Sequence, residues 1–482
     1  MSGEITHGYI NHQWRSSNAF LITVAVVSLF SEKFLYGFIV PILKYMVEFR
    51  LGLDPSSTQN LTTALLAVHG LCSLISAPII AHFADKTPNR KYLLLSSLVG
   101  CALGTSLVAY TPSVWALLLG RIVQGVSGSA TWISSFAMLV DNIEPERKGQ
   151  TLALAMSFVT SGVIGGPAIS GLLFQIAGYW AAWSVPFALL SLDFLARLAM
   201  VDRKSEMPQT TKSVKSSETR GPEDTAGLLS SRKNGYKTIE QNPDGLYRER
   251  TDILESQNAQ GSSSVEVETP GFYRTLLFDP RILTGLAITL AQSVIVAGFD
   301  TTLPLYLQNT FGWGSLPVGM MFLGIQGPPI ILGPLIGGVR DHLGLRYPTA
   351  LGWAIVAPFL WLLAVPGRFD FPWAALDSNG EAIVIVSIVG VGFGFLLIRG
   401  AGAFQLIAVT KELENKSPNI FGPNGANSKI AAMMEVSFNL GMLIGPLVSG
   451  SLSEILGYYY VNCTMSILAL FVAVLSLIYL QR

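Results

Sequence analysis

The sequence has little charge. Only 13% of its 482 residues are Asp, Glu, Lys or Arg, against about 25% in a soluble globular protein, while 50% are hydrophobic. The mean hydropathy is +0.48. This scarcity of charge excludes an ordinary soluble domain and predicts a protein that crosses the membrane several times. Basic and acidic residues balance at 31 each, so the composition gives no reason to expect nucleic acid as a partner.

Cysteine is also scarce. Cys72, Cys101 and Cys463 all lie inside apolar runs, which excludes a disulfide framework and gives no metal-ligand spacing. The sequence has no Walker-type glycine-rich motif and no nucleophile–base constellation, which argues against a primary pump and against an enzyme. We therefore expect no metal and no cofactor. The first apolar run lacks a small-residue cleavage site, so we interpret it as a retained membrane span.

Long apolar runs are what the sequence has in quantity. Twelve of them approach the roughly 20 residues that a bilayer requires. The predicted fold is an all-α membrane protein with twelve transmembrane helices in two pseudo-symmetric six-helix bundles. The spans are predicted at 19–43, 61–83, 92–110, 113–140, 150–174 and 180–200, and at 281–304, 316–338, 348–366, 383–409, 429–452 and 460–480.

A polar stretch separates the two sets of spans. It is rich in Ser, Thr, Gln, Asn, Glu and Lys and cannot bury enough apolar area to fold alone, so it predicts a disordered linker. The short loops on one side of the membrane hold most of the Lys and Arg, which places both termini and the linker in the cytoplasm. The domains predicted are a tail at 1–18, a bundle at 19–201, the linker at 202–279 and a bundle at 280–482. The plasma membrane is favoured, with a vacuolar or vesicular membrane as the alternative.

The two halves repeat each other. "GGPAISGLLFQIAGY" (165–179) matches "IGPLVSGSLSEILGY" (444–458), with the Gly-Pro, Ser-Gly and Gly-Tyr pairs each displaced by 279 positions (445 − 166 = 279; 457 − 178 = 279). "AHFADKTPNR" (81–90) similarly aligns with a segment of 337–346. Repeated six-span halves joined by a long linker predict two bundles that rock about a central site.

These features resemble the major facilitator superfamily, and within it the drug:proton antiporters that include the vesicular monoamine transporters. The loop after the second span resembles the family motif G-x-x-x-D-R-x-G-R-R, although Ala81 and Pro88 replace glycines. In the family this motif is a charge latch between helices that favours one gating state. The residues that the resemblance assigns to the latch are Asp85, Lys86, Arg90, Gly337, Asp341 and Arg346.

Two further motifs carry the resemblance. "GRIVQGVSG" (120–128) resembles the fourth-span motif whose buried arginine, here Arg121, is linked to proton coupling, and Gln124 lies one turn further on the same face. "SGVIGGPAISG" (161–171) resembles the fifth-span antiporter motif, whose glycines and proline let helices approach closely and bend. We expect Gly166 to lie at the interface along which the halves rock. The residues of this motif are Gly162, Gly166, Pro167 and Gly171.

Ionisable residues inside the spans need an explanation. An ionised side chain at mid-bilayer costs roughly 2.5–3.5 kcal/mol on insertion scales, so such residues usually face the bundle interior. Glu32 and Lys33 are consecutive, point about 100° apart on a helix, and are therefore expected to find partners on other helices. The full set within predicted spans is Glu32, Lys33, Arg121, Asp300, Arg399 and Glu435.

The resemblance gives several of these residues a role. Glu32, Asp300 and Glu435 resemble the first-, seventh- and eleventh-span acids of the monoamine transporters. His69 stands where those relatives carry a lysine paired with the eleventh-span acid, so a Glu435–His69 pair is expected. Arg399 departs from the pattern, because the relatives have an acid there. The aromatic residues expected to line the pocket are Tyr36, Trp132, Phe299 and Tyr306.

The sequence therefore predicts a proton-coupled antiporter that exports a small, partly hydrophobic organic compound. The partners expected are that compound, protons and the lipid bilayer, with the chain acting as a monomer. A symporter or uniporter of an organic acid remains open, favoured by Lys33 and Arg399. A transporter-like sensor is a third interpretation. The residues assigned to substrate binding and proton coupling are Glu32, His69, Arg121, Gln124, Asp300, Arg399 and Glu435.

Overall fold

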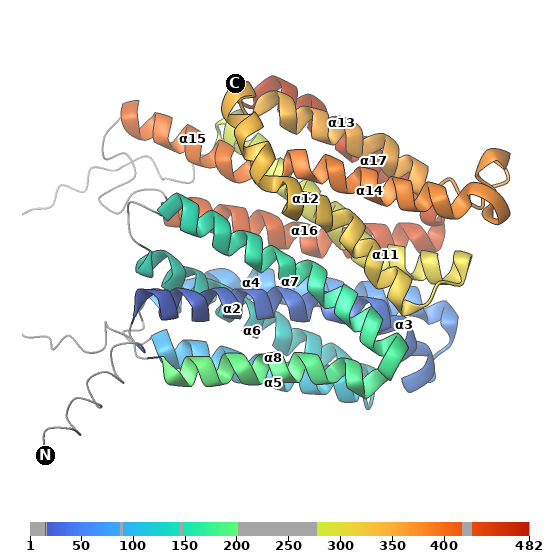
Figure 1. The fold of residues 1–482 in the computed structure, drawn as a ribbon, viewed down its shortest axis with the longest axis horizontal. Coiled ribbons are helices and arrows are strands. Elements are labelled where there is room, and N and C mark those ends of the chain that lie inside the picture. Colours follow the sequence, from blue (N-terminus) through green and yellow to red (C-terminus); the bar gives the residue numbers. More distant parts are fainter. Residues whose placement is uncertain are drawn as a thin grey trace, which may run out of the picture. The chain divides into compact units, whose positions relative to one another are not determined.

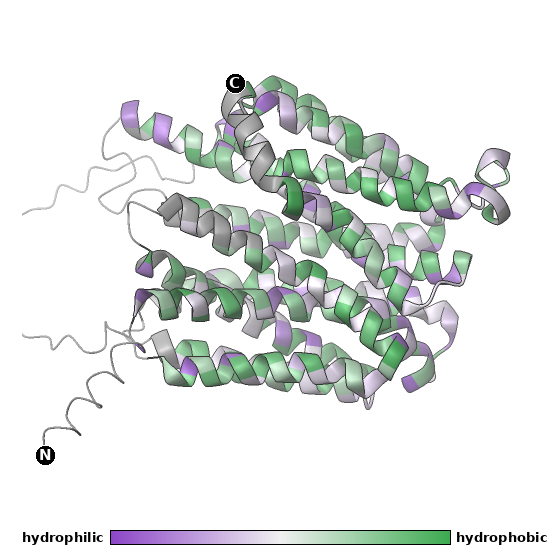
Figure 2. Ribbon diagram, viewed as in Figure 1, coloured by the Kyte–Doolittle hydropathy of each residue, from purple (hydrophilic) through white to green (hydrophobic). Residues whose placement is uncertain are grey.

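The computed structural model describes residues 15, 17–86, 90–143, 148–200, 277–416 and 427–481. Of the predicted linker 202–279, only 277–279 lie within this part of the chain. Every regular element in it is helical, and the long helices run roughly parallel (Figure 1). Their residues are mostly hydrophobic along their length, with hydrophilic residues gathered near many of the helix ends (Figure 2).

Each predicted span corresponds to observed helix, so the twelve-helix prediction is confirmed. The first half contains α2 (Asn18–Phe38), α4 (Thr58–Lys86), α5 (Arg90–Tyr110), α6 (Val114–Asn142), α7 (Lys148–Ala177) and α8 (Tyr179–Ala199). The second contains α11 (Pro280–Phe311), α12 (Ser315–Leu343), α13 (Arg346–Leu363), α14 (Glu381–Ile398), α15 (Ala401–Lys416), α16 (Asn427–Ile455) and α17 (Tyr458–Tyr479). By length and composition alone, 9 helical stretches of the described chain can cross a membrane.

Two predicted spans are broken. The first, predicted as 19–43, leaves α-helical geometry after Phe38 and continues as a 3-10 turn, η1 (Val40–Ile42), because Pro41 has no N–H to continue the ladder. It then runs through α3 (Leu43–Tyr45) and η2 (Met46–Arg50). The tenth, predicted as 383–409, divides into α14 and α15 at Arg399, whose ψ is 127°, and Gly400, whose φ is +75°.

The internal repeat has a structural counterpart. Gly178 precedes α8 and Gly457 precedes α17, and both have positive φ, +85° and +93°. Glycine adopts this conformation at no steric cost. The repeated Gly-Tyr pair is therefore the same turn between the last two helices of each half.

The two ends of the bundle differ. We call the end where α2 begins and α17 ends the tail side, and the opposite end the far side. The hydrogen bonds that join the two halves in the described residues all lie at the far side. They connect Lys44 with Asn309, Gln59 with Thr301, Asn60 with Glu454, Gln308 with Pro41, and Leu316 with Gln175.

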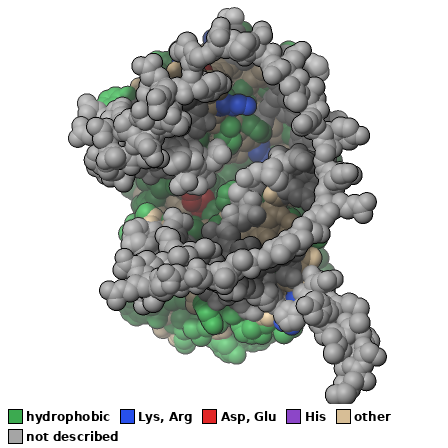
Figure 3. Space-filling view, turned by 90° about the vertical axis from the view of Figure 1, so that its left-hand side faces the viewer, with side chains coloured by type: hydrophobic (Ala, Val, Ile, Leu, Met, Phe, Trp, Pro, Cys, Tyr) green, Lys and Arg blue, Asp and Glu red, His purple; other side chains and the backbone are tan. Residues whose placement is uncertain are grey.

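The tail side is hollowed. Figure 3 looks onto this side and shows acidic and basic side chains deep in the hollow. Together with the contacts at the far side, this arrangement is a conformation open toward the tail side and closed at the far side.

Candidate functional site

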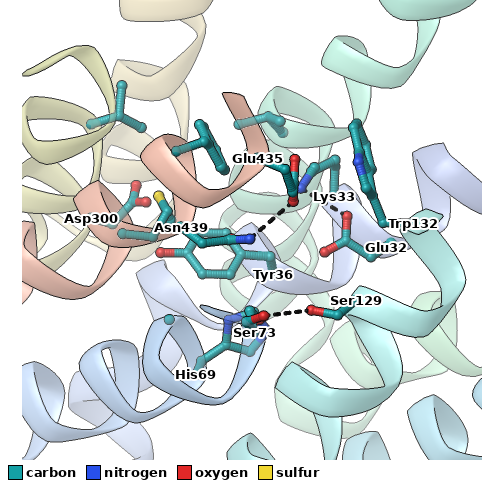
Figure 4. Close-up of a pocket in the computed structure, with 15 residues that line it drawn as sticks. Glu32, Lys33, Tyr36, His69, Ser73, Ser129, Trp132, Asp300, Glu435 and Asn439 are labelled. Atoms are coloured by element: carbon teal, nitrogen blue, oxygen red, sulfur yellow. Dashed lines mark hydrogen bonds and ion pairs between the residues drawn. The ribbon is translucent and has the colours of Figure 1, made fainter. Parts of the chain in front are cut away.

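A cavity lies where six helices from both halves meet. The centre of a water molecule can occupy about 50 Å³ within it. Figure 4 shows that charged side chains from α2, α11 and α16 project into it. Its lining consists of Glu32, Lys33, Tyr36, His69, Gly70, Ser73, Ser129, Trp132, Val163, Val296, Asp300, Glu435, Phe438, Asn439 and Met442.

Glu32 and Lys33 pair with each other, so the expectation that they do not pair as neighbours and find their partners only on other helices is wrong. Lys33 Nζ lies 3.0 Å from Glu32 Oε2, and both side chains are largely buried. The directions of adjacent Cβ atoms do not limit this contact, because the four-carbon stem of lysine bends back over its own helix. Oε2 nevertheless has no hydrogen bond of good geometry, so the contact is a charge pair.

Lys33 also reaches two other helices. Its Nζ lies 4.3 Å from the ring centre of Trp132 on α6 and 5.3 Å from that of Phe438 on α16. A cation over an aromatic face is stabilised by the ring quadrupole, more so where water is excluded. Lys33 thus connects α2, α6 and α16 through its charge, and Glu435 interacts with the same charge.

Glu435 and His69 are not joined in the described structure. Glu435 Oε1 accepts a hydrogen bond of 3.1 Å from Asn439 Nδ2, one turn along α16. The His69 ring packs against Tyr36, with ring centres 5.1 Å apart. The expected pair is therefore wrong for this conformation, although both residues line the cavity.

Asp300 enters the cavity from the second half. It is 7% exposed, and α11 positions it beside the Tyr36 side chain of α2 (Figure 4). The Tyr36 hydroxyl is buried and interacts with Asp300 across the two halves, although no hydrogen bond of good geometry joins it to a described residue. A ligand or a water molecule that enters between the halves would therefore compete for this hydroxyl.

Arg121 and Gln124 do not line the cavity and lie behind Tyr36. The guanidinium carbon of Arg121 is 5.6 Å from the ring centre of Tyr36. Arg121 Nη1 donates to Gln124 Oε1 at 3.1 Å, and Gln124 Nε2 donates to Thr105 Oγ1 at 3.0 Å. The prediction that Arg121 and Gln124 share a face is confirmed, and their bonds tie α6 to α5 behind Tyr36.

Three predicted residues lie elsewhere. Arg399 is half-buried at the break between α14 and α15 and is not among the described lining residues. Phe299 belongs to the hydrophobic core, and Tyr306 stacks on Tyr458 with ring centres 3.9 Å apart. Of the four predicted aromatic residues, Tyr36 and Trp132 line the cavity.

The N-terminal part of the antiporter motif packs within its own half. A Cβ added to Gly162 would come within 2.6 Å of the Phe30 carbonyl oxygen, and one on Gly166 within 2.4 Å of the Phe34 carbonyl oxygen. Only glycine permits such close backbone contact between α7 and α2. The expectation that Gly166 lies between the rocking halves is therefore wrong, because its neighbour is α2 of the same half.

The C-terminal end of the motif contacts the other half of the protein. A Cβ on Gly171 would come within 2.2 Å of the Ser315 carbonyl oxygen at the start of α12. Gly319 of α12 faces the Pro167 carbonyl oxygen, which a Cβ there would approach to 2.5 Å. The interface on which the far side closes is thus formed by Pro167, Gly171, Ser315 and Gly319.

The predicted latch can be described only in part. The side chains of Asp85, Lys86, Arg90 and Asp341, and the surroundings of Gly337, lie outside the described residues. The Arg346 guanidinium carbon lies 5.9 Å from the ring centre of Tyr347, and its Nε is buried without a hydrogen-bond partner in the described structure. The latch remains a prediction.

A buried ion pair in α8 was missed from the sequence. Arg197 Nη2 lies 2.9 Å from Asp193 Oδ2, and both side chains have 0% exposure. Ser28 of α2 donates to Asp193 at 2.7 Å, and Arg197 Nη1 donates to the Leu94 carbonyl oxygen of α5. The acid–base spacing of four residues inside a predicted span was the available signal. This network holds α2, α5 and α8 together.

Known proteins share this architecture. The solved structure of a mutant of the nucleoside transporter NupG superposes with a TM-score of 0.62 at 12% identity, covering 96% of this chain and 100% of that one. An uncharacterized MFS-type transporter of Schizosaccharomyces pombe is 28% identical over 91% of each chain.

Two other relatives have informative names. A probable vesicular acetylcholine transporter-B of Danio rerio is 23% identical over 93% of this chain and 76% of its own. The class E tetracycline resistance protein of Escherichia coli is 24% identical over 74% of this chain and 75% of its own. The family model for the Major Facilitator Superfamily matches residues 21–410. The chain belongs to the major facilitator superfamily and is a multi-pass membrane transporter.

Proposed function

We propose that this transporter exchanges protons for a small, partly hydrophobic organic compound, which it exports. The observation that carries the proposal is the charge of the cavity. Three carboxylates, Glu32, Asp300 and Glu435, face it from both halves, against a single lysine in the described lining. With His69 neutral and the other groups ionised, the lining carries a charge of −2 (one positive minus three negative), and Arg121 behind Tyr36 reduces the balance to −1. Such a site favours cations, and protons are cations that a carboxylate can take up and release.

The lining also suits a compound with an apolar body. Tyr36, Trp132, Phe438 and Met442 present aromatic and thioether surface beside the carboxylates. A ligand site of this kind combines apolar walls with a few placed polar groups. The compound would rest on the aromatic rings while its polar or basic group competes with protons for the acids.

The exchange follows from this competition together with the rocking of the two halves. When the hollow of the tail side is open, deprotonated carboxylates bind the compound. Rocking of the halves would then open the far side, where protonation displaces the compound. By the positive-inside rule, we propose that the tail side faces the cytoplasm, so the compound moves outward while protons move inward.

The relatives support the same class of activity. One is named for vesicular acetylcholine transport and another for tetracycline resistance. Acetylcholine carries a quaternary ammonium group and tetracycline a dimethylamino group, so both are small organic molecules with a nitrogen that can bear a positive charge. An exported amine or drug is therefore our first candidate. The organic-acid alternative depends on Lys33, and in the structure that charge is paired with Glu32.

Sealed vesicles containing the full-length protein test the proposal. A pH gradient is imposed, and uptake of tetracycline, acetylcholine, an aromatic amine and benzoate is compared with uptake by Glu32→Gln. Uptake of an amine or tetracycline into acid-loaded vesicles, lost in the variant, supports antiport. Benzoate moving together with protons would instead establish the organic-acid alternative.

A further inference from the structure

A second, smaller cavity lies on the far side of Asp300. The centre of a water molecule can occupy about 10 Å³ within it, so the cavity has room for about one water molecule. The residues around it come from η1 and α3, which follow α2, from α4 and from α11. They are Val40, Leu43, Lys44, Thr62, Asp300, Thr301, Pro304, Leu305 and Gln308.

Two polar atoms in this cavity lack partners. Thr62 Oγ1 and Gln308 Oε1 are buried, and neither makes a hydrogen bond with a described residue. The Thr62 side chain belongs to a residue with 3% exposure, whereas Gln308 uses its Nε2 to donate to the Pro41 carbonyl oxygen at 3.3 Å. Leaving a buried polar atom without a hydrogen-bond partner is unfavourable, so a site with two such atoms is suited to bind water.

Asp300 is the residue shared by both cavities. On the central side it interacts with Tyr36 of α2 and with the charge of Arg121 of α6. In the second cavity the charged neighbour is Lys44, which donates to Asn309 at the far side. Asp300 therefore stands between the central cavity and a small polar space whose other residues lie nearer the far side.

We propose that Asp300 exchanges its proton with the far side through water held by Thr62 and Gln308, while the halves are still closed there. A hydronium ion entering this space transfers its proton to the carboxylate and leaves a water molecule, and the reverse transfer regenerates the hydronium ion. The space excludes an organic compound, so protons pass the closed far side whereas the compound leaves only when the far side opens. This inference rests on the proposed proton coupling and names its route.

Substitution of Thr62 tests the route. Thr62→Val keeps the volume and removes only the hydroxyl, whereas Thr62→Ser keeps the hydroxyl. Thr302→Val is the matched control, because Thr302 is equally buried, donates to the Gly298 carbonyl oxygen at 2.8 Å and does not line the cavity. The protein is made in a host without glycosylation, since Asn60-Leu-Thr62 is also a glycosylation sequon.

The measurement follows the Asp300 proton itself. Full-length protein is reconstituted with the tail side inside the vesicles, and the pH is dropped outside only. Infrared difference spectroscopy records the rate at which the protonated carboxyl band appears, and Asp300→Asn identifies that band. We expect Thr62→Val to slow this rate at least tenfold, with Thr62→Ser and Thr302→Val at the wild-type rate.

Equal rates in Thr62→Val and wild type would overturn the route, as would equal slowing in Thr302→Val. No substrate is present, so the outcome is independent of the transport assay. A Thr62-dependent Asp300 signal without any compound exchange would contradict the proposed antiport and leave the route intact. Antiport without any effect of Thr62→Val would contradict the proton route and leave the proposed antiport intact.

Discussion

Lys33 Nζ lies 3.0 Å from Glu32 Oε2, although the two residues are neighbours in the chain. Each single substitution of this pair leaves a charge without its partner, whereas a double substitution removes both charges. If Glu32 binds protons or the compound, neutralising the pair cannot restore transport. We therefore expect Glu32→Gln and the double variant Glu32→Gln, Lys33→Met to reach the membrane in normal amounts and to lose pH-driven exchange.

The measurement is exchange in sealed vesicles, normalised to the amount of protein in the membrane. Lys33→Met, which leaves Glu32 ionised, is the matched comparison. Recovered exchange in the double variant would assign the pair a structural role only and would remove Glu32 from the site.

The interface between α7 and α12 predicts a second result. Gly319→Ala places a methyl group 2.5 Å from the Pro167 carbonyl oxygen, whereas Gly327, also on α12, has nothing within 4 Å of an added Cβ. Overpacking costs about 1–3 kcal/mol, and here the cost falls on the closed far side. We expect Gly319→Ala to disfavour the conformation that is open at the tail side and Gly327→Ala to leave it unchanged.

Cysteine accessibility measures this shift. A cysteine introduced at Ser73, which lines the central cavity, should react more slowly with a thiol reagent applied from the tail side in Gly319→Ala. The background is a variant that lacks the native cysteines. The same rate in both glycine variants would show that this contact does not hold the far side closed.

Breaking the Asp193–Arg197 pair should lower the stability of the protein without affecting the chemistry of transport. Removing one partner of a fully buried ion pair destabilises a protein by about 3–5 kcal/mol, since the other charge remains buried. Arg197→Leu should accordingly lower the thermal unfolding temperature of the purified protein. Asp370→Asn, which breaks the exposed contact of 2.9 Å with Arg368, should change it little. An unfolding temperature as high in Arg197→Leu as in wild type would contradict the structural role of the network.

The orientation of the chain is tested separately. Ser56 and Ser378 are exposed at the far side, and the predicted linker contains Ser262, which lies outside the described residues. Cysteines at Ser56 and Ser378 should react with an impermeant reagent outside the cell, or in the lumen if the protein is internal. A cysteine at Ser262 should be protected. Labelling of all three from the same side would contradict the proposed topology.

The sequence was sufficient for the helices because apolar runs of the required length have few alternatives in a bilayer. It was less informative where one residue interrupts a run: Pro41 and Gly400 break predicted spans, and hydropathy does not register either break.

The site was predicted in part. Hydropathy and motif spacing identified Glu32, Asp300 and Glu435, which line one cavity. Pairing was harder, because it depends on side-chain reach and helix rotation. From the angle between their Cβ atoms, Glu32 and Lys33 were expected to find partners on other helices, and a Glu435–His69 pair was expected from the resemblance. The structure pairs Glu32 with Lys33 and does not join Glu435 to His69. Asp193 and Arg197 were overlooked, although their spacing of four residues is visible in the sequence.

Simultaneous recording of the compound and of protons tests the proposed antiport most directly. Acid-loaded vesicles containing the wild-type protein receive tetracycline or an amine outside, and a trapped dye reports the internal pH. The account predicts that uptake of the compound raises the internal pH, and that Asp300→Asn, inserted in equal amounts, abolishes both signals. Uptake at the same rate without a pH gradient, or protons moving in the same direction as the compound, would contradict it.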